Sequence, residues 1–183
     1  MCLTASITIL CADESAVGGF KNLYVASRDS VVSFTKGALH LYDAVSMAST
    51  AVADQWHEIG SKDYTIALEA TNELSDNGPN FVNTSLTLTV PKIDKTKSAQ
   101  LNALKECCKV VVIAVTNEGN AFVYGWDDRV EEKGALRTQV NTTVGAGLGD
   151  PNQYTLTFTG QQVELPYNFE GTILVSGSPV VIS

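Results

Sequence analysis

The side chains that could carry out covalent catalysis are few and form no recognisable arrangement. A serine nucleophile needs a histidine within reach of its hydroxyl, and the chain has only two histidines, His40 and His57. Neither stands in a catalytic motif, and His57 lies beside Trp56 and Glu58, as a structural histidine also would. We therefore predict that the protein is not an enzyme and has no catalytic residue.

The cysteines do not show the spacing of a metal site. A structural zinc site needs Cys-x-x-Cys pairs or suitably spaced histidines, and none of the four cysteines is placed in that way. The adjacent Cys107 and Cys108 do not favour a disulfide, because a vicinal bridge demands a distorted backbone. We predict that they, with Cys2 and Cys11, are free thiols. We expect no metal and no cofactor.

Two loops have the composition of a ligand site without its pattern. The carboxylates between Asp127 and Glu132 lack the alternate-position ligands and central glycine of an EF-hand loop, so we interpret them as a solvated charge run. The glycines at residues 145–149 lack the Lys-Ser/Thr of a phosphate-binding loop, and they lead into a predicted strand. We interpret them as a loop that moves or contacts a partner.

A locally basic segment stands out in an acidic protein. The segment from Lys92 to Lys109 holds five lysines against two carboxylates, whereas the whole chain has a net charge of −8. These lysines either form a solvated face or contact an acidic patch on another subunit. Lys95, Lys105 and Lys109 are our candidates for such a contact.

The elements that would position these side chains are mainly strands, because apolar and polar residues alternate with period two. Residues 64–74 and 82–90 alternate clearly, and the turn formers at 76–80 between them predict an antiparallel hairpin. A second hairpin is predicted from residues 110–115 and 121–126. Its first strand is apolar on both faces, so we expect it to be buried on both sides, under the helix. Further strands are predicted at residues 3–10, 23–26, 31–34, 136–140, 154–159, 173–175 and 180–182.

One helix is predicted, at residues 95–108. Asp94 can accept hydrogen bonds from the first turn, and Leu101, Leu104 and Cys108 form a narrow apolar stripe. With 183 residues and no linker, the chain is one domain, 1–183, with a C-terminal extension from about residue 161. The predicted fold is mainly β: an antiparallel β-sandwich or rolled barrel with one flanking helix.

The composition limits the classes of function. Charged residues make up 17%, below the roughly 25% of an average soluble protein, which fits a surface partly covered by neighbours or a monomer rich in small polar residues. The net charge of −8 argues against a protein that grips nucleic acid by its phosphates. No segment has the length of a membrane helix, and residues 3–11 do not form an export signal.

Three stretches resemble a known family. Residues 15–24 read SAVGGFKNLY and residues 149–160 read GDPNQYTLTFTG. They resemble the opening and the closing strand of structural proteins encoded by phages and prophages of Bacteroidetes. Residues 110–125 resemble the hairpin that precedes that strand. The family often has glycine where Gln153 stands, and this chain continues beyond the closing strand.

The resemblance implies a tail tube subunit of the virion, made in the cytoplasm of the host bacterium. Such proteins are similar to a β-sandwich or rolled barrel with one helix; they form hexameric rings that stack into a conduit, with DNA as passing cargo. Tape-measure and tail terminator proteins would be partners, and no membrane is involved. We expect the loops at residues 44–53 and 127–150 to make contacts between rings. The residues proposed for subunit contacts are Met47, Val52, Asp127, Asp128, Arg129, Val144 and Leu148.

Two alternatives stay open. The protein could be another virion component, either a head-tail connector ring or a capsid-associated protein. From a different class, it could be a β-sandwich module that binds carbohydrate or peptide, with a groove near Trp126.

Overall fold

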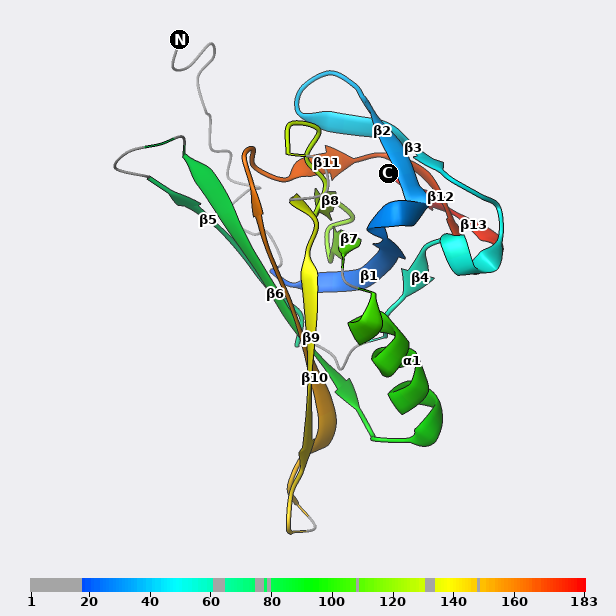
Figure 1. Ribbon diagram of the computed structural model, residues 1–183, viewed down its shortest axis with the longest axis vertical. Coiled ribbons are helices and arrows are strands. Elements are labelled where there is room, and N and C mark those ends of the chain that lie inside the picture. Colours follow the sequence, from blue (N-terminus) through cyan, green and yellow to red (C-terminus); the bar gives the residue numbers. More distant parts are fainter. Residues whose placement is uncertain are drawn as a thin grey trace.

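The computed structural model describes residues 18–60, 65–74, 78, 80–107, 109–130, 134–147 and 149–183. In these ranges the chain forms strands and one α-helix, α1 (Lys95–Glu106) (Figure 1). The strands are β1 (Phe20–Ser27), β2 (Val31–Lys36), β3 (Leu41–Met47), β4 (His57–Glu58), β5 (Ala67–Glu73), β6 (Phe81–Pro91), β7 (Val110–Thr116), β8 (Ala121–Tyr124), β9 (Arg137–Val144), β10 (Asn152–Gln162), β11 (Tyr167–Phe169), β12 (Gly171–Val175) and β13 (Ser178–Ile182). The strand predicted at residues 3–10 lies outside the described residues.

The strands form two main sheets and a small hairpin. One sheet has the order β2-β3-β11-β8-β7-β1-β4, the other has the order β5-β6-β10-β9, and β12 pairs with β13. All strand pairs are antiparallel except β3 with β11. The predicted β-sandwich with one helix is therefore confirmed. Neither sheet closes into a barrel, because each has two end strands.

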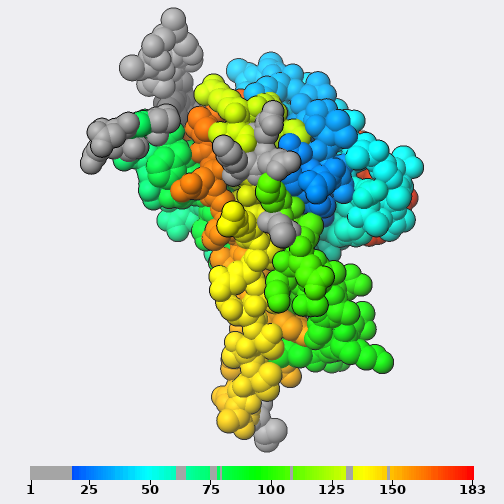
Figure 2. Space-filling view, viewed as in Figure 1, coloured from blue at the N-terminus to red at the C-terminus, as the bar shows by residue number. Residues whose placement is uncertain are grey.

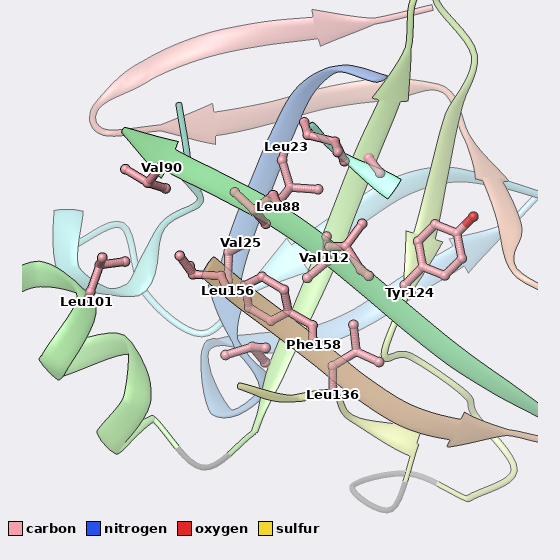
Figure 3. Packing of buried hydrophobic residues seen from close by; sticks show 14 of the residues in the cluster. Leu23, Val25, Leu88, Val90, Leu101, Val112, Tyr124, Leu136, Leu156 and Phe158 are labelled. Atoms are coloured by element: carbon pink, nitrogen blue, oxygen red, sulfur yellow. The ribbon is translucent and has the colours of Figure 1, made fainter. Parts of the chain in front are cut away.

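The four-stranded sheet follows directly from the alternating sequence. On β6 and β10 every second side chain is buried, and the strands pair over ten residues, from Val82 opposite Gln162 to Pro91 opposite Gln153. The buried side chains face the seven-stranded sheet and form the first core cluster (Figure 3). It includes Leu23, Val25, Leu86, Leu88, Val90, Leu101, Val112, Leu136, Tyr154, Leu156 and Phe158.

The strand β7 is the centre of the fold and is buried on both faces, as its apolar run predicts. Val110, Val112 and Ala114 point into the first core cluster. Val111 and Ile113 point to the other side, into a second core cluster that contains Trp56 and residues of β12 and β13. The expectation that β7 lies under the helix holds in part: α1 adds Leu101 to the first core cluster, whereas the other face of β7 meets the C-terminal strands.

The helix α1 begins and packs as predicted. The carboxylate of Asp94 accepts a hydrogen bond of 2.9 Å from the backbone N–H of Lys97, and this bond holds the pKa of Asp94 below its usual value. Leu101 is buried in the first core cluster and Leu104 packs against it, while the Ser98 hydroxyl lies 2.5 Å from the Tyr154 hydroxyl. No helix in the described ranges is long and apolar enough to cross a membrane.

The C-terminal segment is part of the core rather than an appendage. The strand β11 is inserted between β3 and β8, and Phe169, Ile173 and Ile182 are buried in the second core cluster. The region predicted as a loop at residues 44–53 is also partly a strand, since β3 continues to Met47 and pairs with β2. Only the part after Met47 is a loop, with a short 3-10 helix at Val52–Asp54.

Candidate functional site

The outer face of the four-stranded sheet is a continuous polar surface. Because side chains alternate along a strand, the residues between the core-facing ones all lie on this face, and the register aligns them across the strands. Nearly all carry a hydroxyl, an amide or a carboxylate. They are Ala67, Glu69, Thr71 and Glu73 on β5; Asn83, Ser85, Thr87 and Thr89 on β6; Gln153, Thr155, Thr157, Thr159 and Gln161 on β10; and Arg137, Gln139, Asn141 and Thr143 on β9.

This sheet has two long edges, β5 and β9, and neither pairs with another strand among the described residues. An unpaired edge exposes a row of backbone N–H and C=O groups that can template another strand. Monomeric proteins usually protect such edges with charges, proline or bulges. The strand β9 has eight residues, no proline and only one charge, Arg137, and it pairs with β10 without a bulge. Figure 2 shows β9 (yellow) running along the front of the molecule.

The charges on the polar face lie at its two edges. Glu69 and Glu73 stand on β5, and Arg137 stands at the start of β9. A groove of about 620 Å³ crosses the strands between them. Inside the groove the Asn83 amide donates to Glu73 at 2.5 Å and accepts from Gln161 at 3.0 Å. The groove is therefore polar, with acidic and basic ends.

The hairpin of β9 and β10 extends beyond the rest of the molecule. Residues 141–147 are exposed, as are 149–152, and the hairpin projects below the body in Figure 2. Val144, a predicted contact residue, ends β9 opposite Asn152 and is 68% exposed. An exposed apolar side chain on a projecting arm fits a contact with a partner. Leu148, predicted beside it, lies outside the described residues.

The loop after β8 lies at the other end of β10, so the predicted contact residues do not form one surface. Asp127 is only 6% exposed, and its carboxylate accepts hydrogen bonds from the backbone N–H groups of Val163 (2.7 Å) and Arg129 (2.9 Å). The proposal of Asp127 as a subunit contact is corrected, because its side chain is used inside the subunit. The sequence suggests that this charge run is solvated. The structure instead buries Asp127, whose carboxylate binds the backbone of Val163, a residue distant along the chain.

We expect Asp127→Ala to lower the free energy of unfolding by about 1–3 kcal/mol, because two backbone N–H groups lose their acceptor in a buried position. The matched control is Asp29→Ala, the same change at an exposed residue, with an expected change within about 0.5 kcal/mol. Urea unfolding followed by circular dichroism measures both. Equal effects of the two substitutions would show that the Asp127 carboxylate does not hold this loop.

Asp128 and Arg129 are exposed and belong to a network of charges and aromatic rings. Asp128 pairs with Lys36 at 3.0 Å and accepts from the Trp126 indole N–H at 2.7 Å, while Arg129 pairs with Glu164. The hydrogen bond to Asp128 raises the pKa of Lys36. These pairs tie the loop to the β2–β3 hairpin and to the segment after β10. Both side chains stay accessible to a partner.

The histidines do not form a catalytic pair. The His40 ring stacks on Tyr167 with centroids 3.6 Å apart, and its Nε2 donates to the Leu165 carbonyl oxygen at 2.9 Å. His57 is exposed on β4 opposite Val25. Among the described residues, no three His, Cys, Asp or Glu side chains are placed to hold a metal ion. Cys107 is free and half-buried; the other three cysteines lie outside the described residues.

The remaining predicted contact residues are scattered. Met47 is half-buried and packs against the second core cluster, whereas Val52 is 54% exposed on its 3-10 helix. Lys95 and Lys105 are exposed on α1. Lys109 lies beyond the end of α1 and is half-buried, so its assignment to a helical contact face is corrected.

The tryptophans do not line a binding groove. Trp56 is fully buried and Trp126 is 7% exposed, with the Arg28 guanidinium 4.1 Å from the Trp126 ring. The prediction of a ligand groove near Trp126 is therefore corrected, because this side chain is buried.

In comparisons with known proteins, no family model, no curated protein and no solved structure matches the chain.

Proposed function

We propose that the protein is a self-assembling virion subunit, the tail tube protein of a bacteriophage, whose copies form stacked hexameric rings around a conduit for DNA. The observation that carries this proposal is the four-stranded sheet with its long edges β5 and β9, which no described strand pairs. A second copy of the chain supplies the strand that each edge lacks. Pairing also removes the aggregation hazard of two open edges.

The strand directions support closure into a ring. Successive strands of the sheet are antiparallel, so β5 and β9 run in opposite directions. Rotation about an axis roughly along the strands keeps those directions, and it brings β9 of one copy beside β5 of the next. The new pair is therefore antiparallel, like every other pair in this sheet. Repetition of one such heterologous contact gives a closed ring.

The polar face supports the role of a conduit. The other face of this sheet is covered by the seven-stranded sheet and α1, so the polar face is the one that would line the lumen. It carries two carboxylates and one guanidinium among hydroxyl and amide groups. A surface without clustered cations does not hold DNA phosphates. DNA would slide along such a wall rather than bind to it.

The projecting β9–β10 hairpin supports stacking of one ring on the next. The hairpin extends beyond the body of the subunit in the direction of its strands (Figure 2), and its Val144 is exposed. A head-to-tail contact along that direction leaves a free surface at each end of the stack, so further rings can be added. Tape-measure and tail terminator proteins are proposed partners of the finished tube.

Two other functions stay as alternatives. A head-tail connector ring or a capsid-associated virion protein would use the same sheet edges and differ in the position of the ring in the particle. The polar groove across β5, β6, β10 and β9 favours a different class, a β-sandwich module for carbohydrate or peptide. Such a module would be a monomer.

Negative-stain electron microscopy of the purified full-length protein, together with sedimentation velocity, tests the proposal. We expect rings or tubes, and a sedimenting species that grows with protein concentration. A monodisperse monomer of 19.5 kDa at every concentration would reject the tail tube assignment and favour the binding module.

A further inference from the structure

The charged residues of the polar face are matched across the sheet. The register places Glu69 opposite Ser85, Ser85 opposite Thr159, and Thr159 opposite Arg137. One straight row thus begins with a carboxylate at the β5 edge and ends with a guanidinium at the β9 edge. Glu73 lies on the same face of β5, two positions further along that face. We call Glu69 and Glu73 the acidic edge.

These charges have no partner of opposite sign in the part of the subunit that the structure describes. Arg137 forms no ion pair there, and it is exposed. The acidic edge receives only neutral donors among those residues: the Thr71 hydroxyl lies 3.4 Å from Glu69, and the Asn83 amide lies 2.5 Å from Glu73. All three charged side chains are exposed.

We propose that Arg137 forms an ion pair with the acidic edge of a neighbouring copy and thereby fixes the register of the joint between subunits. This inference rests on the proposed self-assembly. When β5 of a second copy pairs with β9, both sets of residues lie on the same face of the joined sheet. An arginine reaches a carboxylate directly opposite or one diagonal position away. With Arg137 opposite the neighbour's Thr71, both Glu69 and Glu73 stand one diagonal position away.

The rest of β9 explains why a register device is needed. Residues 138–144 carry no charge and are mostly threonine, glutamine and asparagine. A uniform polar strand specifies its pairing register weakly, so it can slip by two residues with the same face outward. Arg137 is the one residue of β9 whose energy changes strongly with such a slip. Its pairing favours the register opposite Thr71, because a slip by two residues leaves only one of the two carboxylates within its reach.

Reciprocal charge reversal tests the pair. One variant carries Arg137→Glu, and a second carries Glu69→Arg together with Glu73→Arg. Each variant alone places like charges across every joint. We expect the concentration at half-assembly to rise by about tenfold or more at roughly 0.05 M salt, and less at about 0.5 M salt. Sedimentation velocity and negative-stain microscopy measure it.

An equal mixture of the two variants should assemble again. In alternating order, the carboxylate introduced by Arg137→Glu in one variant faces the guanidinium groups introduced on β5 of the other. The unchanged Arg137 of the second variant faces the native acidic edge of the first. We expect a half-assembly concentration within about threefold of the wild type. Lys21→Glu, which makes the same charge change at an exposed position of β1, is the control and should assemble as the wild type does.

The outcomes separate this inference from the proposed function. If the wild type assembles and both variants assemble equally well alone, the ion pair is rejected and the tail tube proposal stands. If the variants fail alone and also fail when mixed, while circular dichroism shows them folded, Arg137 does not face the acidic edge. A wild type that stays monomeric rejects both proposals. The ion pair is supported if neither variant assembles by itself and the equal mixture of the two does.

Discussion

Proline on the outer edge of β9 is expected to abolish self-assembly and leave the subunit folded. Proline has no backbone N–H and therefore removes one donor from a ladder. Successive residues of a strand direct their N–H groups to opposite sides, so of two adjacent positions one donates to β10 and the other to the free edge. Asn141 and Thr142 are adjacent and exposed on β9.

We would make Asn141→Pro and Thr142→Pro and first measure the melting temperature of each. The variant with the higher melting temperature of the two has lost an edge donor rather than a bond to β10, because edge strands tolerate proline on the solvent side. This variant should show no rings or tubes by microscopy and sediment as a monomer. Asn141→Ala and Thr142→Ala keep the backbone N–H and serve as controls that assemble. Normal tubes from both proline variants would mean that β9 is not a joint between subunits.

The alternating strands of the four-stranded sheet could be predicted from the sequence, because their two faces have different environments. The strands β6 and β10 separate a dry core from a polar surface, and the polar and apolar residues alternate accordingly. The strand β7 was also predictable, since both of its faces are buried and the whole strand is apolar. Asp94 likewise identified the start of the helix.

The strands β3 and β11 could not be predicted in the same way. The burial along β3 does not alternate cleanly, because β11 pairs only with its first two residues and much of the rest faces solvent. The strand β11 has only three residues, and it is held in the sheet by pairing with β3 on one side and β8 on the other. Its partners are far away in the chain, so no local pattern marks it. The strand β11 was therefore not predicted, whereas the strands at residues 173–175 and 180–182 were, as parts of β12 and β13.

The candidate assembly surface was only partly visible in the sequence. The polar side of each strand could be identified from the sequence. The alignment of Glu69 with Arg137 across the sheet could not, because it depends on the register of four strands. Asp127 was proposed instead as part of a long loop at residues 127–150, and its run of carboxylates was interpreted as solvated. The structure encloses Asp127 through the backbone of Val163, and this contact depends on the tertiary fold. A run of charges in the sequence is therefore a poor guide to which side chains are exposed.

The second large effect is expected from Phe158→Ala, which should remove about 3–5 kcal/mol from the free energy of unfolding. Phe158 is fully buried on β10 and pairs with Leu86, in the cluster that joins the two sheets (Figure 3). Its loss leaves a cavity between two rigid layers that cannot easily collapse. A typical domain is stable by only about 5–15 kcal/mol, so this loss is a large fraction of the total and should lower the urea midpoint markedly.

The control for this substitution is the preceding residue, whose side chain points the other way. Thr157→Val keeps the β-branched shape on the polar face and loses only a hydroxyl, so we expect a change within about 0.5 kcal/mol. Both changes should be made in the assembly-blocking proline variant, because association of folded subunits raises apparent stability. Urea unfolding then reports the fold alone. Similar losses from both substitutions would contradict a sandwich in which one face of β10 is core and the other is free for the lumen.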